Sequence, residues 1–175
     1  DGGTGFKAQA PTGLEDASLA MHRAMPEIAP VRRVGLLVYG PGGADGCSGI
    51  DVRFAPVAEA GEQVVGEIDR LSPNGLTPIA TSVRAAAEAL DYTRAPGIVV
   101  LVTDGNETCG GRPCALSEEL AQKGVDLTVH VIGFRVVYDP FSWNSPEAQS
   151  YDGGKTVAKC LADQTGGMFV STETV

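Results

Sequence analysis

The chain has 175 residues, 43% of them hydrophobic, which suits a single globular domain with a core of its own. Its formal net charge of -9 argues against nucleic-acid binding, because that function needs a basic surface to displace counterions from phosphates. No apolar run reaches the ~20 residues needed to span a membrane, and no charged-then-apolar leader is visible, as would also be true of a mature exported chain.

The first half of the chain predicts a helix followed by a strand hairpin. Residues 1–13 form no regular pattern, and a helix is expected over 14–28, where one face would carry Leu14, Ser18, Met21, Met25 and Ile28. Strands are expected over 34–39 and 50–54, joined by a glycine-rich loop over 40–46. Because this loop leads into a strand and not into a helix, a phosphate-binding loop and a nucleotide-binding function are not expected.

From residue 64 onward, helices and strands alternate. In chain order we expect a short helix over 64–71, a helix over 79–90, a strand over 98–102, a helix from Pro113 or Cys114 to Gly124, a strand over 125–134, a helix from about 157 to Gly166 and a strand over 168–170. This alternation predicts an α/β domain with a mainly parallel sheet and helices on both faces. The strand over 50–54 is expected at its antiparallel edge.

Two short segments carry the candidate chemistry. The apolar run over 98–102 is typical of a strand buried on both faces of a parallel sheet, and Asp104 follows where that run stops. Such an acid would project into the crevice at the carboxyl edge, where open α/β sheets bind ligands. Thr77 lies where the helix over 79–90 opens, and its hydroxyl and the Asp104 carboxylate could bind one hard cation. Taken singly, Thr77 could instead be a helix N-cap and Asp104 a turn residue.

The two segments, Asn74-Gly75-Leu76-Thr77-Pro78-Ile79 and Val102-Thr103-Asp104-Gly105, together resemble the von Willebrand factor A (VWA) family. Thr77 matches the Thr of the family's metal-ion-dependent adhesion site (MIDAS) within G-x-T-P-[IL], and Asp104 matches its Asp within V-[TS]-D-G. The resemblance covers the chain from about Leu14 to Val170. It implies a Rossmann-like α/β fold with a mainly parallel central sheet and one antiparallel edge strand.

The third MIDAS motif, an Asp-x-Ser-x-Ser loop after the central strand, has no clear counterpart in this sequence. The segment Asp16-Ala17-Ser18-Leu19-Ala20 imitates it, but no apolar run precedes this segment and its residues fit a helix. We therefore expect the first strand and its loop to lie upstream of Asp1 or to come from a second fragment or chain.

The resemblance implies a non-catalytic protein-recognition domain. Thr77 and Asp104 would hold Mg²⁺, or Mn²⁺ or Ca²⁺, once an Asp-x-Ser-x-Ser segment completes the site, and an acidic residue of a partner protein would join the cation. The alternative is an assembly module of a larger complex with a degenerate, metal-free site, in which another chain or fragment supplies the missing strand. An enzyme is not expected, because His22 and His130 fall in a predicted helix and strand with no clearly paired serine or cysteine.

The chain has four cysteines, Cys47, Cys109, Cys114 and Cys160. An even number without a Cys-x-x-Cys pair is typical of disulfides, so a periplasmic or extracellular location is expected. A zinc site and reduced, buried thiols are the alternatives. On the sheet that the VWA resemblance implies, all four lie near the ligand edge. The favoured pairs are then Cys47–Cys109 and Cys114–Cys160, and a local Cys109–Cys114 bridge is the rival.

Residues 136–154 form a long connection that carries four of the ten aromatic residues, Tyr138, Phe141, Trp143 and Tyr151. Long loops on rigid scaffolds are often functional, and aromatic anchors are typical of interfaces. We expect either a partner-binding loop beside Asp104 or a small satellite core. The triplet Asn106-Glu107-Thr108 matches a glycosylation sequon, a pattern that is common by chance.

Overall fold

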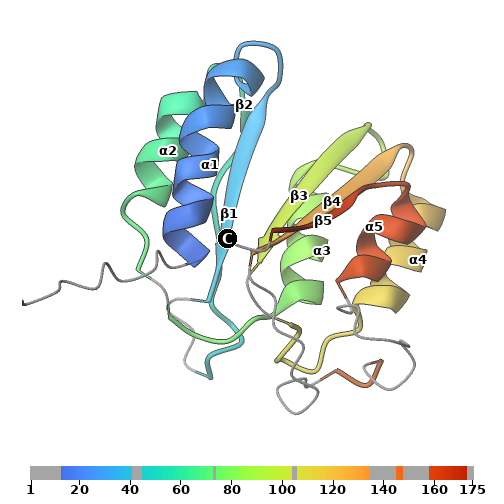
Figure 1. The fold of residues 1–175 in the computed structure, drawn as a ribbon. Helices are drawn as coiled ribbons and strands as arrows, with labels where there is room; N and C mark the ends of the chain where they lie inside the picture. The colour runs from blue at the N-terminus through green and yellow to red at the C-terminus, as the bar shows by residue number, and fades with distance from the viewer. Residues whose placement is uncertain are drawn as a thin grey trace, which may run out of the picture.

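A computed structural model describes residues 13–40, 45–72, 74–103, 106–134, 145–147 and 158–172. Over these residues the chain forms five helices and five strands (Figure 1). The strands lie in the middle of the molecule, with α1 and α2 on one side and α3, α4 and α5 on the other. None of the described helices is long and apolar enough to cross a membrane.

The first half is an antiparallel strand pair covered by two helices. Helix α1 (Gly13–Ile28) ends just before Pro30, and strands β1 (Val34–Tyr39) and β2 (Ile50–Val57) pair antiparallel. Helix α2 (Gly61–Ile68) then packs beside α1. A small cluster of buried residues holds these elements together; its members are Met25, Ala60 and Val64.

The second half is a three-stranded parallel sheet. In chain order its elements are α3 (Ile79–Ala89), β3 (Gly97–Thr103), α4 (Pro113–Lys123), β4 (Leu127–Phe134), α5 (Lys159–Thr165) and β5 (Phe169–Thr172). The strand order is β3-β4-β5, with both pairs parallel. Helices α4 and α5 therefore return the chain across the sheet between parallel strands, as parallel pairing requires.

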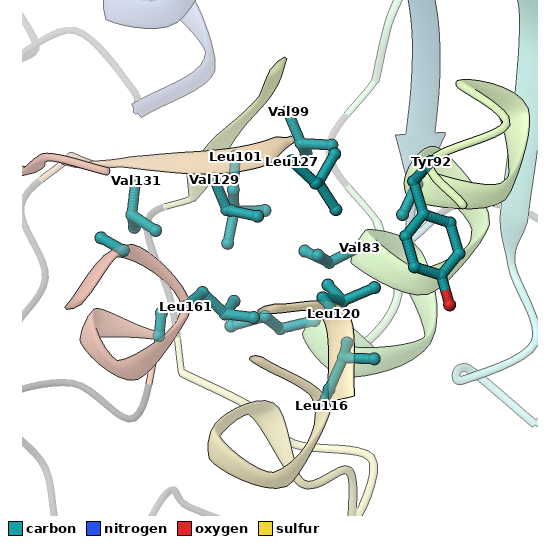
Figure 2. Packing of buried hydrophobic residues seen from close by; sticks show 14 residues of the cluster. Val83, Tyr92, Val99, Leu101, Leu116, Leu120, Leu127, Val129, Val131 and Leu161 are labelled. Carbon is teal, nitrogen blue, oxygen red and sulfur yellow. The ribbon is translucent and has the colours of Figure 1, made fainter. Parts of the chain in front are cut away.

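One face of this parallel sheet carries the main core of the molecule. Figure 2 shows Val99, Leu101, Leu127, Val129 and Val131 of β3 and β4 above side chains from α3, α4 and α5. Those helix residues include Val83, Leu120 and Leu161, which are at most 1% exposed. The opposite face is open at β3, where the Ile98 and Val100 side chains are each 50% exposed. Burial on one side and exposure on the other follow from the alternation of side chains along a strand.

The predicted elements are confirmed in type and order, and most bounds agree within two or three residues. Leu71 lies beyond the end of α2, and β4 begins at Leu127 and not at Val125. The Asp16–Ala20 segment lies inside α1, which confirms the helix interpretation.

The described residues show the expected α/β arrangement in part, as an antiparallel pair β1–β2 and a separate parallel sheet β3-β4-β5. The physical reason is that no described strand lies between β1 and β3 to hydrogen-bond to both. The antiparallel relation of β2 to β1 was predicted correctly.

Candidate functional site

A cavity of about 340 Å³ lies between the two sheets. The start of α1, strand β1, the loop before α3 and the end of β3 line it. Within the described residues, β1 pairs only with β2 and β3 only with β4, so no described strand joins the two sheets at this cavity. The Tyr39 hydroxyl donates to the Val102 carbonyl at 3.2 Å and ties the two strands at one end of this opening.

Thr77 lies in the lining of this cavity, within a loop that contacts the β1–β2 loop on one side and Thr108 on the other. On one side the Leu76 N–H donates to the Gly46 carbonyl at 3.0 Å, and Gly75 packs against Gly40. Gly75 has φ +87°, and a Cβ there would lie 1.9 Å from the Gly40 carbonyl oxygen, so only glycine fits. Thr77 is thus held close to the end of β1.

Thr77 is not the N-cap of α3, although the sequence allowed that interpretation. The cap position is Pro78, and its side chain makes no capping hydrogen bond. No hydrogen bond from the Thr77 hydroxyl caps α3. Asp104, the second candidate ligand, lies outside the described residues. Its neighbour Thr103, the last residue of β3, lines the same cavity as Thr77.

The described lining offers hydroxyl and amide oxygens, from Ser72, Asn74, Thr77 and Thr103, and neither sulfur nor imidazole. Such donors fit Mg²⁺, Mn²⁺ or Ca²⁺ better than softer metals. The described residues alone do not gather three or more His, Cys, Asp or Glu side chains around one point. A cation at this cavity would therefore need Asp104 and further oxygen ligands.

Sequence reasoning missed Glu107, whose side chain is 1% exposed. Its carboxylate accepts the Ala80 N–H at the start of α3, at 2.9 Å, and the Cys109 N–H at 2.8 Å. The signal that could have indicated such a residue is Pro78, because a helix that lacks a capping side chain of its own leaves N–H groups that need another acceptor.

The sequon is not available in the folded chain. Asn106 is 6% exposed, and its Oδ1 is buried without a hydrogen-bond partner among the described residues. The Thr108 hydroxyl oxygen accepts the Thr77 N–H at 2.8 Å. The triplet therefore serves packing at the start of α3.

Both favoured disulfides are present, Cys47–Cys109 and Cys114–Cys160, and no described cysteine is free. The zinc site, the reduced thiols and the local Cys109–Cys114 bridge are therefore wrong. Asp45 shapes the turn before Cys47 by accepting the N–H groups of Ser48 and Cys47, and these bonds lower the pKa of Asp45. Two disulfides are typical of proteins outside the reducing cytosol.

The aromatic residues Tyr138, Phe141, Trp143 and Tyr151 lie outside the described residues. The described part of the same connection, 145–147, is anchored at the start of α4. Glu147 accepts the Cys114 and Ala115 N–H groups at 2.7 and 2.9 Å, and Ser145 donates to the Gly111 carbonyl at 2.8 Å. Residues 145–147 therefore lie beside the loop after β3 and the start of α4.

The two histidines have structural contacts. Asp69 accepts from the Ser18 hydroxyl at 2.7 Å and from His22 Nε2 at 3.0 Å, which links α1 to the end of α2. A nucleophile–base pair needs serine bonded to histidine, whereas here the carboxylate lies between them. His130, on the middle strand β4, accepts the Met168 N–H at 3.0 Å just ahead of β5.

Comparisons with known proteins connect this chain to others of unassigned function. No family model matches it. It is 36% identical over 95 residues to the uncharacterized protein YwmD of Bacillus subtilis, and 39% identical over 75 residues to the uncharacterized protein YwmC of the same organism. The matched regions cover 53% and 42% of this chain, and 42% and 32% of those relatives. The chain therefore spans less than half the length of the curated relatives that it matches.

The solved structures match a larger share of this chain than the two relatives do. The conserved hypothetical protein BatB from Bacteroides thetaiotaomicron matches with a TM-score of 0.61 and 16% identity, over 95% of this chain and 82% of BatB. Proximal thread matrix protein 1 from the mussel byssus matches with a TM-score of 0.59 and 16% identity, over 90% of this chain and 38% of that protein. At these identities the likeness shows a shared fold, an α/β arrangement common to all three.

Proposed function

We propose that these residues belong to a VWA-type recognition domain that binds a partner protein through a divalent cation at the carboxyl edge of the sheet. The observation that carries the proposal is the cavity between β1 and β3, with Thr77 and Thr103 in its lining. An apolar strand placed there would pair with both β1 and β3. The loop after it would then reach the neighbourhood of Thr77 and Asp104.

The residues of this chain would contribute two kinds of oxygen. Thr77 would offer a neutral hydroxyl from a loop that is already fixed, and Asp104 would offer a carboxylate, directly or through a water molecule. A bound Mg²⁺, Mn²⁺ or Ca²⁺ would supply an electrophilic centre for an acidic side chain of the partner. The two disulfides support a periplasmic or extracellular setting for this interaction.

The connection over 136–154 is the proposed selectivity surface. Its described residues Ser145 and Glu147 hydrogen-bond to Gly111 and to the start of α4, on the loop that follows β3 and Asp104. Aromatic side chains carried by this connection would then lie within reach of a partner bound at the cation.

The test is a Mn²⁺ titration followed by electron paramagnetic resonance. It uses the chain alone and a completed domain, defined as the chain with an apolar strand ending in Asp-x-Ser-x-Ser joined ahead of Asp1. We expect the completed domain to bind Mn²⁺ at least tenfold more tightly than the chain alone. Asp104→Ala and Thr77→Val should each remove most of that gain. A completed domain that folds and binds no Mn²⁺ would contradict the proposal.

The second candidate function is an assembly module whose cavity accepts a strand from another chain with no metal involved. The absence of a described strand between β1 and β3 favours it, because strand addition supplies affinity through main-chain hydrogen bonds. Asp104→Ala separates the two functions. It should abolish cation-dependent partner binding in the first and leave assembly intact in the second.

A further inference from the structure

The loop after β3 and the start of α3 are joined by hydrogen bonds from two consecutive residues, Glu107 and Thr108. The Thr108 hydroxyl accepts the Thr77 N–H at 2.8 Å, and the Thr108 N–H donates to the Thr77 carbonyl at 3.1 Å. Glu107 accepts the Ala80 N–H at 2.9 Å. Both main-chain polar groups of Thr77 are thus held by Thr108, and the first turn of α3 is held by Glu107.

Glu107 accepts a second hydrogen bond besides the one from the start of α3. Its second oxygen accepts the Cys109 N–H at 2.8 Å, so the same carboxylate also folds its own loop. Cys109 is bonded to Cys47 in the loop after β1. Glu107 therefore lies at the junction of three segments, the β1–β2 loop, the start of α3 and the loop after β3.

The space around this carboxylate is closed. A Cβ on Gly111 would lie 2.5 Å from Glu107 Oε2 and 2.8 Å from the Ala80 Cβ, so the loop packs tightly over the side chain. A buried acceptor with two N–H partners in a tight pocket has little freedom to move. The position of the Thr77 turn is thereby fixed before any ligand arrives.

We infer that Glu107, assisted by Thr108, is a positioning residue that holds the Thr77 hydroxyl in register with the end of β3 for cation binding. The inference rests on the proposed function, because it assigns Glu107 a role in the affinity of that site. Residues that orient metal ligands from outside the coordination sphere typically change metal affinity by roughly 10–100-fold. Glu107 acts in this way without touching the cation.

Glu147 supplies a matched control. It also uses two oxygens to accept N–H groups at a helix start beside a disulfide, but the helix is α4 and Thr77 is not involved. Glu107→Gln keeps a single acceptor oxygen for two N–H groups, and Glu147→Gln makes the same change at α4. Thr108→Val is a second variant, which removes the acceptor of the Thr77 N–H and leaves Glu107 in place.

The experiment measures amide hydrogen exchange over 77–80 and Mn²⁺ affinity in the completed domain, at a temperature where all variants are folded. We expect Glu107→Gln and Thr108→Val to accelerate exchange over 77–80 about tenfold and to weaken Mn²⁺ binding by roughly tenfold or more. Glu147→Gln should accelerate exchange at Cys114 and Ala115 and change Mn²⁺ affinity less than twofold.

Three outcomes would overturn the inference. The first is unchanged exchange over 77–80 in both test variants, and the second is faster exchange with unchanged Mn²⁺ affinity. The third is an equal loss of affinity in Glu147→Gln, which would mean a general effect of helix capping. A parent domain that binds no Mn²⁺ refutes the proposed function and the affinity role of Glu107 together, while the exchange rates still decide whether Glu107 holds the Thr77 turn.

Discussion

The two halves of the molecule differ in how they are stabilised. The parallel half, β3-β4-β5 with α3, α4 and α5, contains a cluster of fourteen buried hydrophobic residues. The antiparallel half, β1–β2 with α1 and α2, contains a cluster of three. Because buried apolar area is the main favourable term in folding, we expect the antiparallel half to depend more on its links to the rest than the parallel half does.

The links between the two halves lie at the carboxyl edge, beside the candidate site. The Cys47–Cys109 disulfide, the Tyr39–Val102 hydrogen bond and the close contact of Gly40 with Gly75 all join the end of β1 to loops of the parallel half. Helix α3 also contacts strands of both halves. The comparison teaches that the described residues join the two halves through cross-links at the carboxyl edge, while no described strand joins β1 to β3.

Removing one disulfide at a time should cause the largest loss in the free energy of unfolding among these predictions. Replacing both cysteines of either pair by alanine should lower the free energy of unfolding by about 4 kcal/mol, because the closed loops, with separations of 62 and 46 residues, are similar in length. The location of the damage should differ. Hydrogen exchange should accelerate across β1 and β2 without Cys47–Cys109, and across α4 and α5 without Cys114–Cys160. Identical exchange maps would refute the division into halves.

Truncating one core side chain in each half compares the two clusters directly. Leu161→Ala removes a side chain that is fully buried in the parallel half and should cost about 3 kcal/mol in urea unfolding. Met25→Ala, in the smaller cluster, should cost about 2 kcal/mol and should expose α1 to proteolysis first. A larger loss at Met25 than at Leu161 would reverse the assignment of the dominant core.

Gly111→Ala tests the packing around Glu107. The new methyl group would lie 2.5 Å from the carboxylate oxygen, so we expect a loss of about 1–2 kcal/mol in thermal unfolding together with displacement of Glu107. Gly66→Ala is the control. Its Cβ meets nothing within 4 Å inside helix α2, so that substitution should raise stability by roughly 0.5–1 kcal/mol. Equal effects at both glycines would contradict the account of the Glu107 pocket.

The smallest expected effect is a pH dependence of stability that comes from Glu119 in the parallel half. Arg84, and then Lys123, donate hydrogen bonds to Glu119 and lower its pKa from an ordinary 4.5 to about 2. A depressed pKa in the folded chain stabilises it above the unfolded pKa, and this contribution is lost as the pH falls from 4.5 towards 2. Urea midpoints measured over that window should fall more steeply for the parent chain than for Glu119→Gln. Parallel curves would show that the pair contributes nothing measurable.

The elements could be predicted because each is marked locally. The apolar run over 98–102 indicates a buried strand, and the glycines at 124 and 166 mark the ends of α4 and α5. The disulfide pairs followed from the order of the strands that the family resemblance implied, since this order brings the four cysteine loops to one edge.

The caps and the break in the sheet could not be predicted in the same way. Glu107 binds Ala80, 27 residues away, and Glu147 binds Cys114, 33 residues away, and no local pattern encodes such contacts. The described residues form two separate sheets, and a single sheet would need a middle strand that pairs with both β1 and β3.

The most direct test of the central claim is amide hydrogen exchange across β1 and β3, in the chain alone and in the completed domain. If the cavity between these strands accepts a strand, the N–H groups of Val34–Val38 that point away from β2 and those of Ile98–Val102 that point away from β4 should become protected, and β2 and β4 should change little. Unchanged exchange in β1 and β3, in a completed domain that is otherwise folded, would contradict the account.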